Sequence, residues 1–398
     1  MKRIFLTVTL VMAIVFYAGA QKKMLNVASS ELDKGELYKA WEAIEVAKTN
    51  DETKSLPKTW LIRGKILQAI AASLDTKYTA LYDNPLFEAY ASYQKAIELD
   101  EKKKISKEIE LMYIQYGSNP GMVNLCINKG VDEFKNSKFD TSLEYFELAM
   151  KIETNPMFKN IDTLVIFNAG LAAKSAKKYD KAIEYLNKAI EYKYGGSNTY
   201  SLLKDAYFGK GDTISGLATI NKASEIFPND LSVLVDFINY YLSKGQAVEA
   251  MNYLAKAKEK EPNNVSFYFA EGTMYEKMNQ PDKATEAYLK ATEIDPKYFN
   301  SWYNLGVMYY NKAVKLFGDA NNTTDNDKYN ELLKQGDEAL KLAIPYMQKA
   351  HEIDPKERTT METLKSIYFR LQMNPELEQI KAELDQLDHI NNKKGEPK

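Results

Sequence analysis

The feature that most constrains the fold of this chain is one fixed spacing that returns many times along it. Gly272 and Tyr275 are followed, 34 positions later in each case, by Gly306 and Tyr309. The same spacing relates two longer series, which are Ala189, Ala223, Ala257 and Ala291, and Pro228, Pro262 and Pro296. A spacing kept over so many positions indicates that the chain repeats one structural unit.

Each period contains two short segments in which apolar or small residues return every three or four positions, the pattern of two amphipathic helices. Gly272 and Gly306 fall inside such segments, where glycine costs about 1 kcal/mol relative to alanine in a helix. We therefore expect the partner helix to come very close at these glycines. One pair of helices cannot bury its apolar face alone, so neighbouring pairs must stack.

These positions resemble the tetratricopeptide repeat, a helix-turn-helix unit of the same length. The matching residues are Trp302, Leu305, Gly306 and Tyr309 in one segment, and Ala284, Tyr288 and Pro296 before it. The resemblance extends over nearly all of the chain after residue 20. It implies an all-α fold, a right-handed α-solenoid of stacked helix-turn-helix repeats.

The repeats are expected to fill residues 21–390, as about eight copies followed by capping helices. Breaks in the period predict three insertions, near residues 74–85, 101–122 and 315–338. Within the second, residues 101–116 are predicted to form a linking helix that ends at the glycine-containing stretch 117–121. The third is expected to lengthen two helices into an arm. Residues 391–398 are predicted to be a disordered tail.

Residues 1–20 have the pattern of a secretory signal peptide. Lys2 and Arg3 precede an apolar run at residues 4–17, and small residues lead to a predicted cleavage after Ala20. The alternative is an uncleaved membrane anchor, but the run is shorter than the roughly 20 residues that a spanning helix needs. We expect an exported protein, periplasmic or secreted, that meets the membrane only through this transient segment.

Composition argues against several classes of function. The chain has 53 Lys and Arg against 55 Asp and Glu, so it lacks the basic excess expected of a nucleic-acid-binding protein. Cys126 is the only cysteine, and His351 and His389 are the only histidines. These counts disfavour a thiolate zinc site, a two-histidine metal site and a Ser-His-Asp triad. We expect no catalytic residues, no metal and no cofactor.

The third insertion contains an acidic string. Asp319, Asn321, Thr323 and Asp325 alternate as calcium ligands do in an EF-hand loop. The turn glycine of that loop is missing, and Glu331 falls one place late. We therefore predict a solvated loop between two helices.

Several repeats carry a small polar residue at their second position, near the expected helix start. These residues are Asn124, Asn198, Ser232, Ser266 and Asn300. Asn and Ser at a helix start accept hydrogen bonds from exposed backbone N–H groups, an interaction that contributes about 1 kcal/mol. Capping accounts for them, so they are not candidates for binding.

Proteins of the resembled family bind extended peptides or partner helices in a concave groove lined by the first helix of each repeat. The sixth repeat position gives Asn128, Asn168, Asp236 and Asn304. In some family members asparagines of the groove hold a peptide backbone, since an amide both donates and accepts hydrogen bonds. Here the series is interrupted by Leu202 and Ala270. Hydrogen bonding between repeats is the alternative, and the sequence leaves both open.

The fifth and ninth positions carry apolar and aromatic residues with one amide. They are Phe167, Val235, Asn239, Phe269 and Tyr303. Such a run suits a groove for an extended segment with apolar and polar side chains, although burial is the expected role of Phe167. Family members that grip the terminal carboxylate of a chaperone do so with paired cations. No Lys or Arg occupies the fifth position here, which disfavours that partner.

These observations predict a non-enzymatic scaffold that binds a peptide segment or a partner protein through a groove spanning the third to eighth repeats. The candidate binding residues are Asn128, Asn168, Asp236, Asn239, Phe269, Tyr303 and Asn304. The alternative is a glycan-binding helical-repeat protein of a bacterial envelope, since Tyr and Trp rings also stack on sugars. Such proteins usually carry a lipidated cysteine after the signal peptide, and Gln21 stands there instead.

Overall fold

The computed structural model describes residues 23–73, 75–79, 81–116, 119–158 and 161–394. The predicted signal peptide and its cleavage site lie outside these residues. Contacts within the chain divide it into two compact units, Met1–Ala223 and Ser224–Lys398, with the division falling inside one helix.

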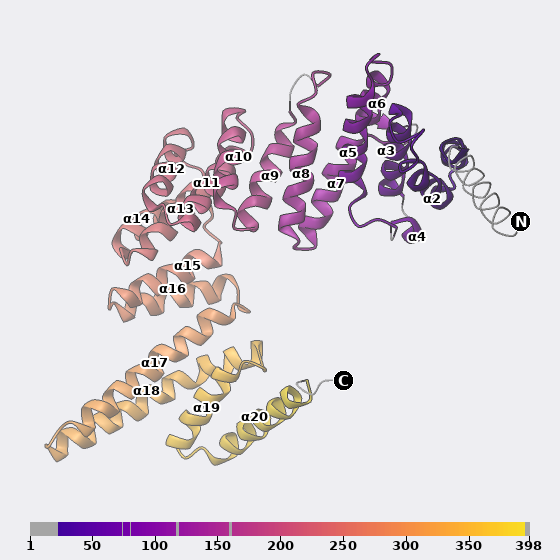
Figure 1. Ribbon diagram of the computed structural model, residues 1–398. Coiled ribbons are helices and arrows are strands. Elements are labelled where there is room, and N and C mark those ends of the chain that lie inside the picture. The colour runs from indigo at the N-terminus through magenta and orange to yellow at the C-terminus, as the bar shows by residue number, and fades with distance from the viewer. Residues whose placement is uncertain (1–22, 74, 80, 117–118, 159–160, 395–398) are drawn as a thin grey trace, which may run out of the picture. The chain divides into compact units, whose positions relative to one another are not determined.

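Unit 1 is built from antiparallel helices that follow one another along the chain (Figure 1). After helical residues 23–33, its elements are α2 (Leu37–Ala47), α3 (Pro57–Ala72), α4 (Thr76–Thr79), α5 (Pro85–Leu99), α6 (Ser106–Ile114), β1 (Gln115–Tyr116), β2 (Asn119–Pro120), α7 (Met122–Lys135), α8 (Phe139–Glu153), α9 (Thr163–Ser175), α10 (Tyr179–Glu191), α11 (Gly196–Lys210) and α12 (Thr213–Ile226). From α7 to α11 each helix packs on the next one along the chain.

Unit 2 contains longer helices and is organised in the same way. Its helices are α13 (Leu231–Ser243), α14 (Ala247–Lys260), α15 (Val265–Lys277), α16 (Pro281–Ile294), α17 (Phe299–Asn321), α18 (Asn326–Ile353), α19 (Arg358–Arg370) and α20 (Asn374–Lys394). Each one packs on its neighbour along the chain, as expected for stacked helical pairs. In the part of the chain that the structure describes, no helix is both long and apolar enough to cross a membrane.

The all-α repeat architecture is confirmed, with one departure in the second insertion. The predicted linking helix from residue 101 is wrong in extent, because helix α6 spans only Ser106–Ile114. Lys103 has a positive φ of 49°, which no helix accommodates, and the carboxylate of Asp100 accepts the N–H of Ile105 at 2.7 Å. The chain therefore turns before α6 begins, and a short antiparallel pairing of β1 with β2 follows it.

Glycines inside the first helices lie directly against the second helix of the same repeat. A Cβ atom at Gly272 would lie 2.5 Å from the ring of Tyr288, and one at Gly306 would lie 2.6 Å from Cγ of Met347. The predicted close approach of the partner helix is therefore confirmed. The contact offsets the helical cost of glycine, since it allows a large side chain to be fully buried at this point.

The alanines and large side chains that follow the repeat form the core of each unit. Ala189, Ala257 and Ala291 are fully buried, as are the rings of Tyr93 and Tyr288. Small residues let the helices approach, and the large ones fill the remaining space. Packing between neighbouring helices thus accounts for these positions.

The predicted helix caps are wrong by two positions where the structure shows a side-chain cap. The carboxylate of Asp230 accepts the N–H of Ser232, and the amide oxygen of Asn264 accepts the N–H of Ser266. The serines therefore lie inside the first turn and donate to the cap. A cap residue must have non-helical backbone, which residues 230 and 264 have and the serines do not.

The third insertion lengthens α17 and α18 into an arm, as predicted. The acidic string forms its tip, where the Asp325 carboxylate accepts the N–H groups of Asp327 and Lys328 and so caps α18. Arg370 of α19 holds the arm, since its Nε lies 2.9 Å from Asp337 and its guanidinium lies 4.5 Å from the centre of the Phe317 ring.

At the C-terminus, α20 continues to Lys394, beyond the predicted boundary at residue 390. The rest of the predicted tail, residues 395–398, lies outside the described part of the chain.

Candidate functional site

The seven candidate residues are divided between the two units. Asn128 and Asn168 lie in unit 1, and the other five lie in unit 2. Asn128 and Asn239 are exposed. The side chains of Asn168, Phe269, Tyr303 and Asn304 are half-buried, and Asp236 is buried. One groove through the third to eighth repeats stays a prediction.

In unit 2, two of the candidates meet at the ring of Tyr288 on α16. The ring of Phe269 lies 5.6 Å from the ring of Tyr288, measured between centroids. Asn304 donates a hydrogen bond from Nδ2 to the hydroxyl oxygen of Tyr288 at 3.1 Å. The Tyr288 hydroxyl in turn donates to Glu276 at 2.5 Å. Three consecutive helices, α15, α16 and α17, are thereby joined through one side chain.

Burial raises the pKa of Tyr288, and its hydrogen bond to the Glu276 carboxylate raises it further. The phenol therefore stays protonated and keeps its role as a donor throughout the physiological range. Burial also raises the pKa of Tyr303, with a smaller contribution from the charge of Glu357. Neither phenol is poised to act as a base near neutral pH.

The hydrogen bond of Asn304 matches the second of the two interpretations of the sixth position, which is bonding between repeats. It uses one amide N–H of Asn304. An asparagine side chain has two donors and one acceptor oxygen, so a further donor and the acceptor are left for other partners. Asn304 can thus join two repeats and still contact a bound segment.

Tyr303, next to Asn304 on α17, stacks on Phe299 with ring centroids 5.6 Å apart and an interplanar angle of 19°. It also packs against the apolar cluster formed by α17, α18, α19 and α20. On α13, Asn239 is exposed, whereas Asp236 one turn earlier is 9% exposed and has its own interactions. Of these two, Asn239 is the side chain that a partner can reach.

In unit 1, Asn128 lines a cleft of about 560 Å³. The cleft lies between the end of α3, the start of α5 and the exposed side of α7. Tyr82 and Asp83, which belong to the first predicted insertion, form part of one wall. Asn168, on α9, is not among the residues that line it.

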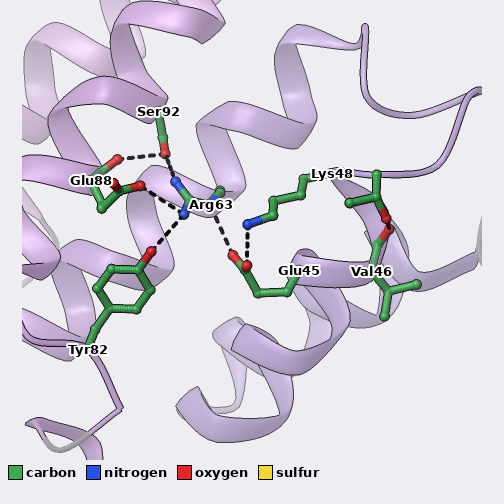
Figure 2. Close-up of polar contacts among 8 residues, drawn as sticks. Glu45, Val46, Lys48, Arg63, Tyr82, Glu88 and Ser92 are labelled. Carbon is green, nitrogen blue, oxygen red and sulfur yellow. Dashed lines mark hydrogen bonds and ion pairs between the residues drawn. The ribbon is translucent and has the colours of Figure 1, made fainter.

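Beside this cleft, a buried arginine fixes the insertion to the repeats (Figure 2). Arg63 is 4% exposed and donates to Glu45 at 3.0 Å, to Glu88 at 3.0 Å, to Ser92 at 2.7 Å and to the hydroxyl of Tyr82 at 3.3 Å. These contacts join α2, α3, α5 and the insertion. A buried guanidinium is stable only when its donors are paired, so this network has a structural role.

Sequence reasoning missed both Arg63 and the cleft. Arg63 lies between Ile62 and Gly64 in a first helix that is mostly apolar, and a charge at such a position was the available signal. The cleft had no comparable signal, because its walls come from segments that only folding brings together. Among the described residues, no group of three potential metal ligands lies close enough to hold an ion.

Two family models match the chain. One, described as a tetratricopeptide repeat, matches residues 165–194, which cover most of α9 and all of α10. The other, described as a TPR repeat, matches residues 272–312, from α15 into α17. The chain is a tetratricopeptide-repeat protein. The helical pairs and the glycine contacts described above are those of this repeat, so the resemblance inferred from the sequence is confirmed.

Several solved structures are similar to this tetratricopeptide-repeat protein. The C-terminal part of a TPR repeat-containing protein from Cytophaga hutchinsonii is 16% identical, with 67% of this chain and 97% of that chain covered and a TM-score of 0.47. A TPR repeats protein from Bacteroides fragilis is 21% identical, with 67% and 98% covered and a TM-score of 0.26.

A third structure, YrrB, is described as a TPR protein with an unusual peptide-binding site. It is 18% identical, with 50% of this chain and 96% of that chain covered and a TM-score of 0.36. At such identities and scores the likeness carries no argument about function. A comparison with curated proteins gives no match.

Proposed function

We propose that this protein is a non-enzymatic scaffold that binds a peptide segment or a partner protein on the first helices of its repeats. The observation that carries the proposal is the fifth repeat position in unit 2. Val235, Phe269 and Tyr303 occupy it on α13, α15 and α17, and all three side chains are half-buried. Side chains that are anchored on one side and accessible on the other suit recognition of an extended segment.

Polar groups beside these side chains can supply specificity. Asn239 is exposed on α13, and Asn304 keeps an N–H and an oxygen available after bonding to Tyr288. A bound backbone needs both donors and acceptors, which amide side chains provide together. Apolar contacts would then supply most of the affinity, and the amides would select the register.

The glycan alternative needs aromatic faces that a sugar ring can reach. Tyr309 stacks on Tyr346 with centroids 5.7 Å apart and an interplanar angle of 5°, and Trp302 stacks on the same tyrosine at 6.3 Å. Packing within the repeat accounts for these rings. These three rings therefore give no reason to prefer glycan binding to peptide binding.

We also propose that the protein is exported and acts in the periplasm or outside the cell. This rests on the pattern of residues 1–20 alone. Sequencing the N-terminus of protein purified from its native host tests it, and a mature chain that begins at Gln21 is expected. A chain that retains residues 1–20 would contradict the proposed cleavage.

The binding proposal is tested with a variant whose changes spare the Tyr288 contacts. We choose Asn239→Arg with Tyr303→Ala, which adds bulk at an exposed position and removes one half-buried ring. The matched control is Asn252→Arg with Tyr192→Ala, since both residues are exposed and neither lies on a first helix.

The measurement is crosslinking in the native host, followed by mass spectrometry of what co-purifies with each protein. Proteins captured by the parent and the control should be lost from the Asn239→Arg, Tyr303→Ala variant. The same loss should appear when a captured partner is purified and titrated. Equal capture by all three proteins would show that this face of unit 2 does not bind partners.

A further inference from the structure

The cleft of unit 1 and a second hollow beside it share a wall. The cleft has a largely apolar lining, which includes Ile70, Leu86, Leu125 and Val131. The hollow has a volume of about 520 Å³ and is lined by residues 81–84 together with residues of α5 and α8. Tyr82 and Asp83 line both of them. A chain segment that crosses this wall can place one side chain on each side of it.

The hollow differs from the cleft in its charge. Its lining contains the carboxylates of Asp83, Glu88 and Glu144, together with the rings of Tyr82 and Phe87, and none of the described residues that line it is a lysine or arginine. By contrast, the lining of the cleft includes Lys129, Lys135 and Asp132 besides Asp83, so the cleft has no excess of carboxylates over lysines. The two neighbouring spaces therefore suit different side chains.

Two of the three carboxylates are available to a ligand. Glu88 is already paired with the buried Arg63 at 3.0 Å. Asp83 and Glu144 are exposed, and neither forms an ion pair with another described residue. Lys178 interacts electrostatically with Glu144, but its ammonium nitrogen forms an ion pair with the carboxylate of Asp140 at 2.6 Å. The hollow thus keeps two carboxylates that no ion pair within the described residues occupies.

Aromatic rings beside these carboxylates strengthen the preference for a cation. Phe87 and Tyr82 line the same hollow as Asp83 and Glu144. A guanidinium or ammonium group gains from a ring face and from a charge-assisted hydrogen bond to a carboxylate. An acidic side chain would meet repulsion from the same groups. Charge complementarity therefore selects a basic side chain here.

We propose that this part of unit 1 binds an extended segment of a partner protein that carries an apolar side chain beside a lysine or arginine. The apolar side chain occupies the cleft, near Val131 and Leu86, and the basic side chain occupies the hollow between Asp83 and Glu144. Asn128 lies at the cleft, where its amide can bond to the backbone of the segment. This inference rests on the proposed function and specifies its ligand.

The experiment selects peptides from a displayed random library on the purified full-length protein. A selected peptide is then labelled with fluorescein and titrated by fluorescence anisotropy. Replacing its basic residue by alanine, or its apolar residue by serine, should each weaken binding. Reversing two exposed charges in Asp83→Lys with Glu144→Lys should weaken binding about tenfold. The basic side chain of the peptide would lose its attraction to two partly exposed carboxylates and would be repelled by the new lysines.

Two further variants isolate the cause of this loss. Glu101→Lys with Glu191→Lys makes the same change in net charge at exposed sites outside the hollow, and it should bind as the parent does. The neutral variant Asp83→Asn with Glu144→Gln should show a smaller loss than the charge reversal. Circular dichroism should show nearly the same melting for all of them, since substitutions at exposed positions usually change stability little.

The possible results separate the two proposals. Selected peptides that combine apolar and basic residues, and that bind the reversed variant weakly, support the inference. Selected peptides without basic residues, or peptides that bind the reversed variant as well as the parent, overturn the inference and leave the proposed function in place. A failure of the parent to select any peptide would count against both.

Discussion

Replacing Gly272 by alanine tests the idea that glycine sets the distance between paired helices. The new Cβ would lie 2.5 Å from Cε1 of Tyr288, much less than a van der Waals contact. The ring cannot easily move aside, because Tyr288 is fully buried and its hydroxyl bonds to both Glu276 and Asn304. Either the helices separate or these hydrogen bonds break.

The expected magnitude follows from three contributions. Overpacking a filled core costs about 1–3 kcal/mol. Weakening a hydrogen bond of the Tyr288 hydroxyl costs about 1 kcal/mol more. Alanine recovers about 1 kcal/mol through its better helix propensity. We therefore expect Gly272→Ala to lower the free energy of unfolding by about 2 kcal/mol.

Gly318 supplies the matched control. It lies inside α17, and a Cβ atom there would have no other atom within 4 Å. Gly318→Ala should therefore stabilise the protein by up to about 1 kcal/mol, through helix propensity alone. Urea unfolding of both variants, followed by far-ultraviolet circular dichroism, measures the difference. A Gly272→Ala variant as stable as Gly318→Ala would refute the reasoning.

The chain itself suggests a rescue. At the equivalent positions of the preceding repeat, Ile238 stands in place of Gly272 and Leu254 in place of Tyr288, and both are buried. A smaller partner thus allows a side chain where glycine would otherwise be needed. In a Tyr288→Leu background, the alanine at position 272 should cost less than it does in the parent. An unchanged cost would locate the strain elsewhere.

Three further predictions concern the other contacts. Arg63→Ala should lower the free energy of unfolding by about 3 kcal/mol in urea titrations, because it removes a buried side chain together with its hydrogen bonds to Glu45, Glu88, Ser92 and Tyr82; an unchanged midpoint would show that the network has no structural role. Burial raises the pKa of Tyr145 to about 12 in the folded protein, whereas a tyrosine in the unfolded chain has a pKa of about 10. Ionisation of Tyr145 therefore favours unfolding once the pH exceeds about 10. The stability it contributes is present below pH ~10 and is lost as the pH rises toward 12, so Tyr145→Phe should make the alkaline fall in stability less steep. Arg370→Ala should speed hydrogen exchange at residues 326–338, since it frees the arm from Asp337, and unchanged exchange would mean that other contacts hold the arm.

The polar residues of the repeats were harder to anticipate than the apolar ones. The sequence assigned Asn304 two possible roles and could not choose between them. Its bond to Tyr288 depends on a ring that comes from the preceding helix and on the glycine that admits that ring. Hydrogen-bond partners of this kind are set by packing geometry, which spacing along the chain does not record.

The same limit explains the errors at helix ends. A serine near the start of a repeat was assigned to the cap, but Asp230 and Asn264 hold that position two places earlier. Asp, Asn and Ser all favour caps, so composition alone cannot say which of several neighbours has the non-helical backbone. The turn before α6 was missed for a similar reason, since a positive φ at Lys103 leaves no mark in the sequence.

What the sequence determined by itself is the repeat: its length, its helices, the glycines at the contacts and the arm built from the third insertion. These follow from periodicity, because helices that bury one face must place small and apolar residues at regular intervals. The tertiary structure alone decided where the cleft and its acidic neighbour lie. Their walls come from α3, α5, α7, α8 and residues 81–84, which are separated along the chain and meet only when it folds.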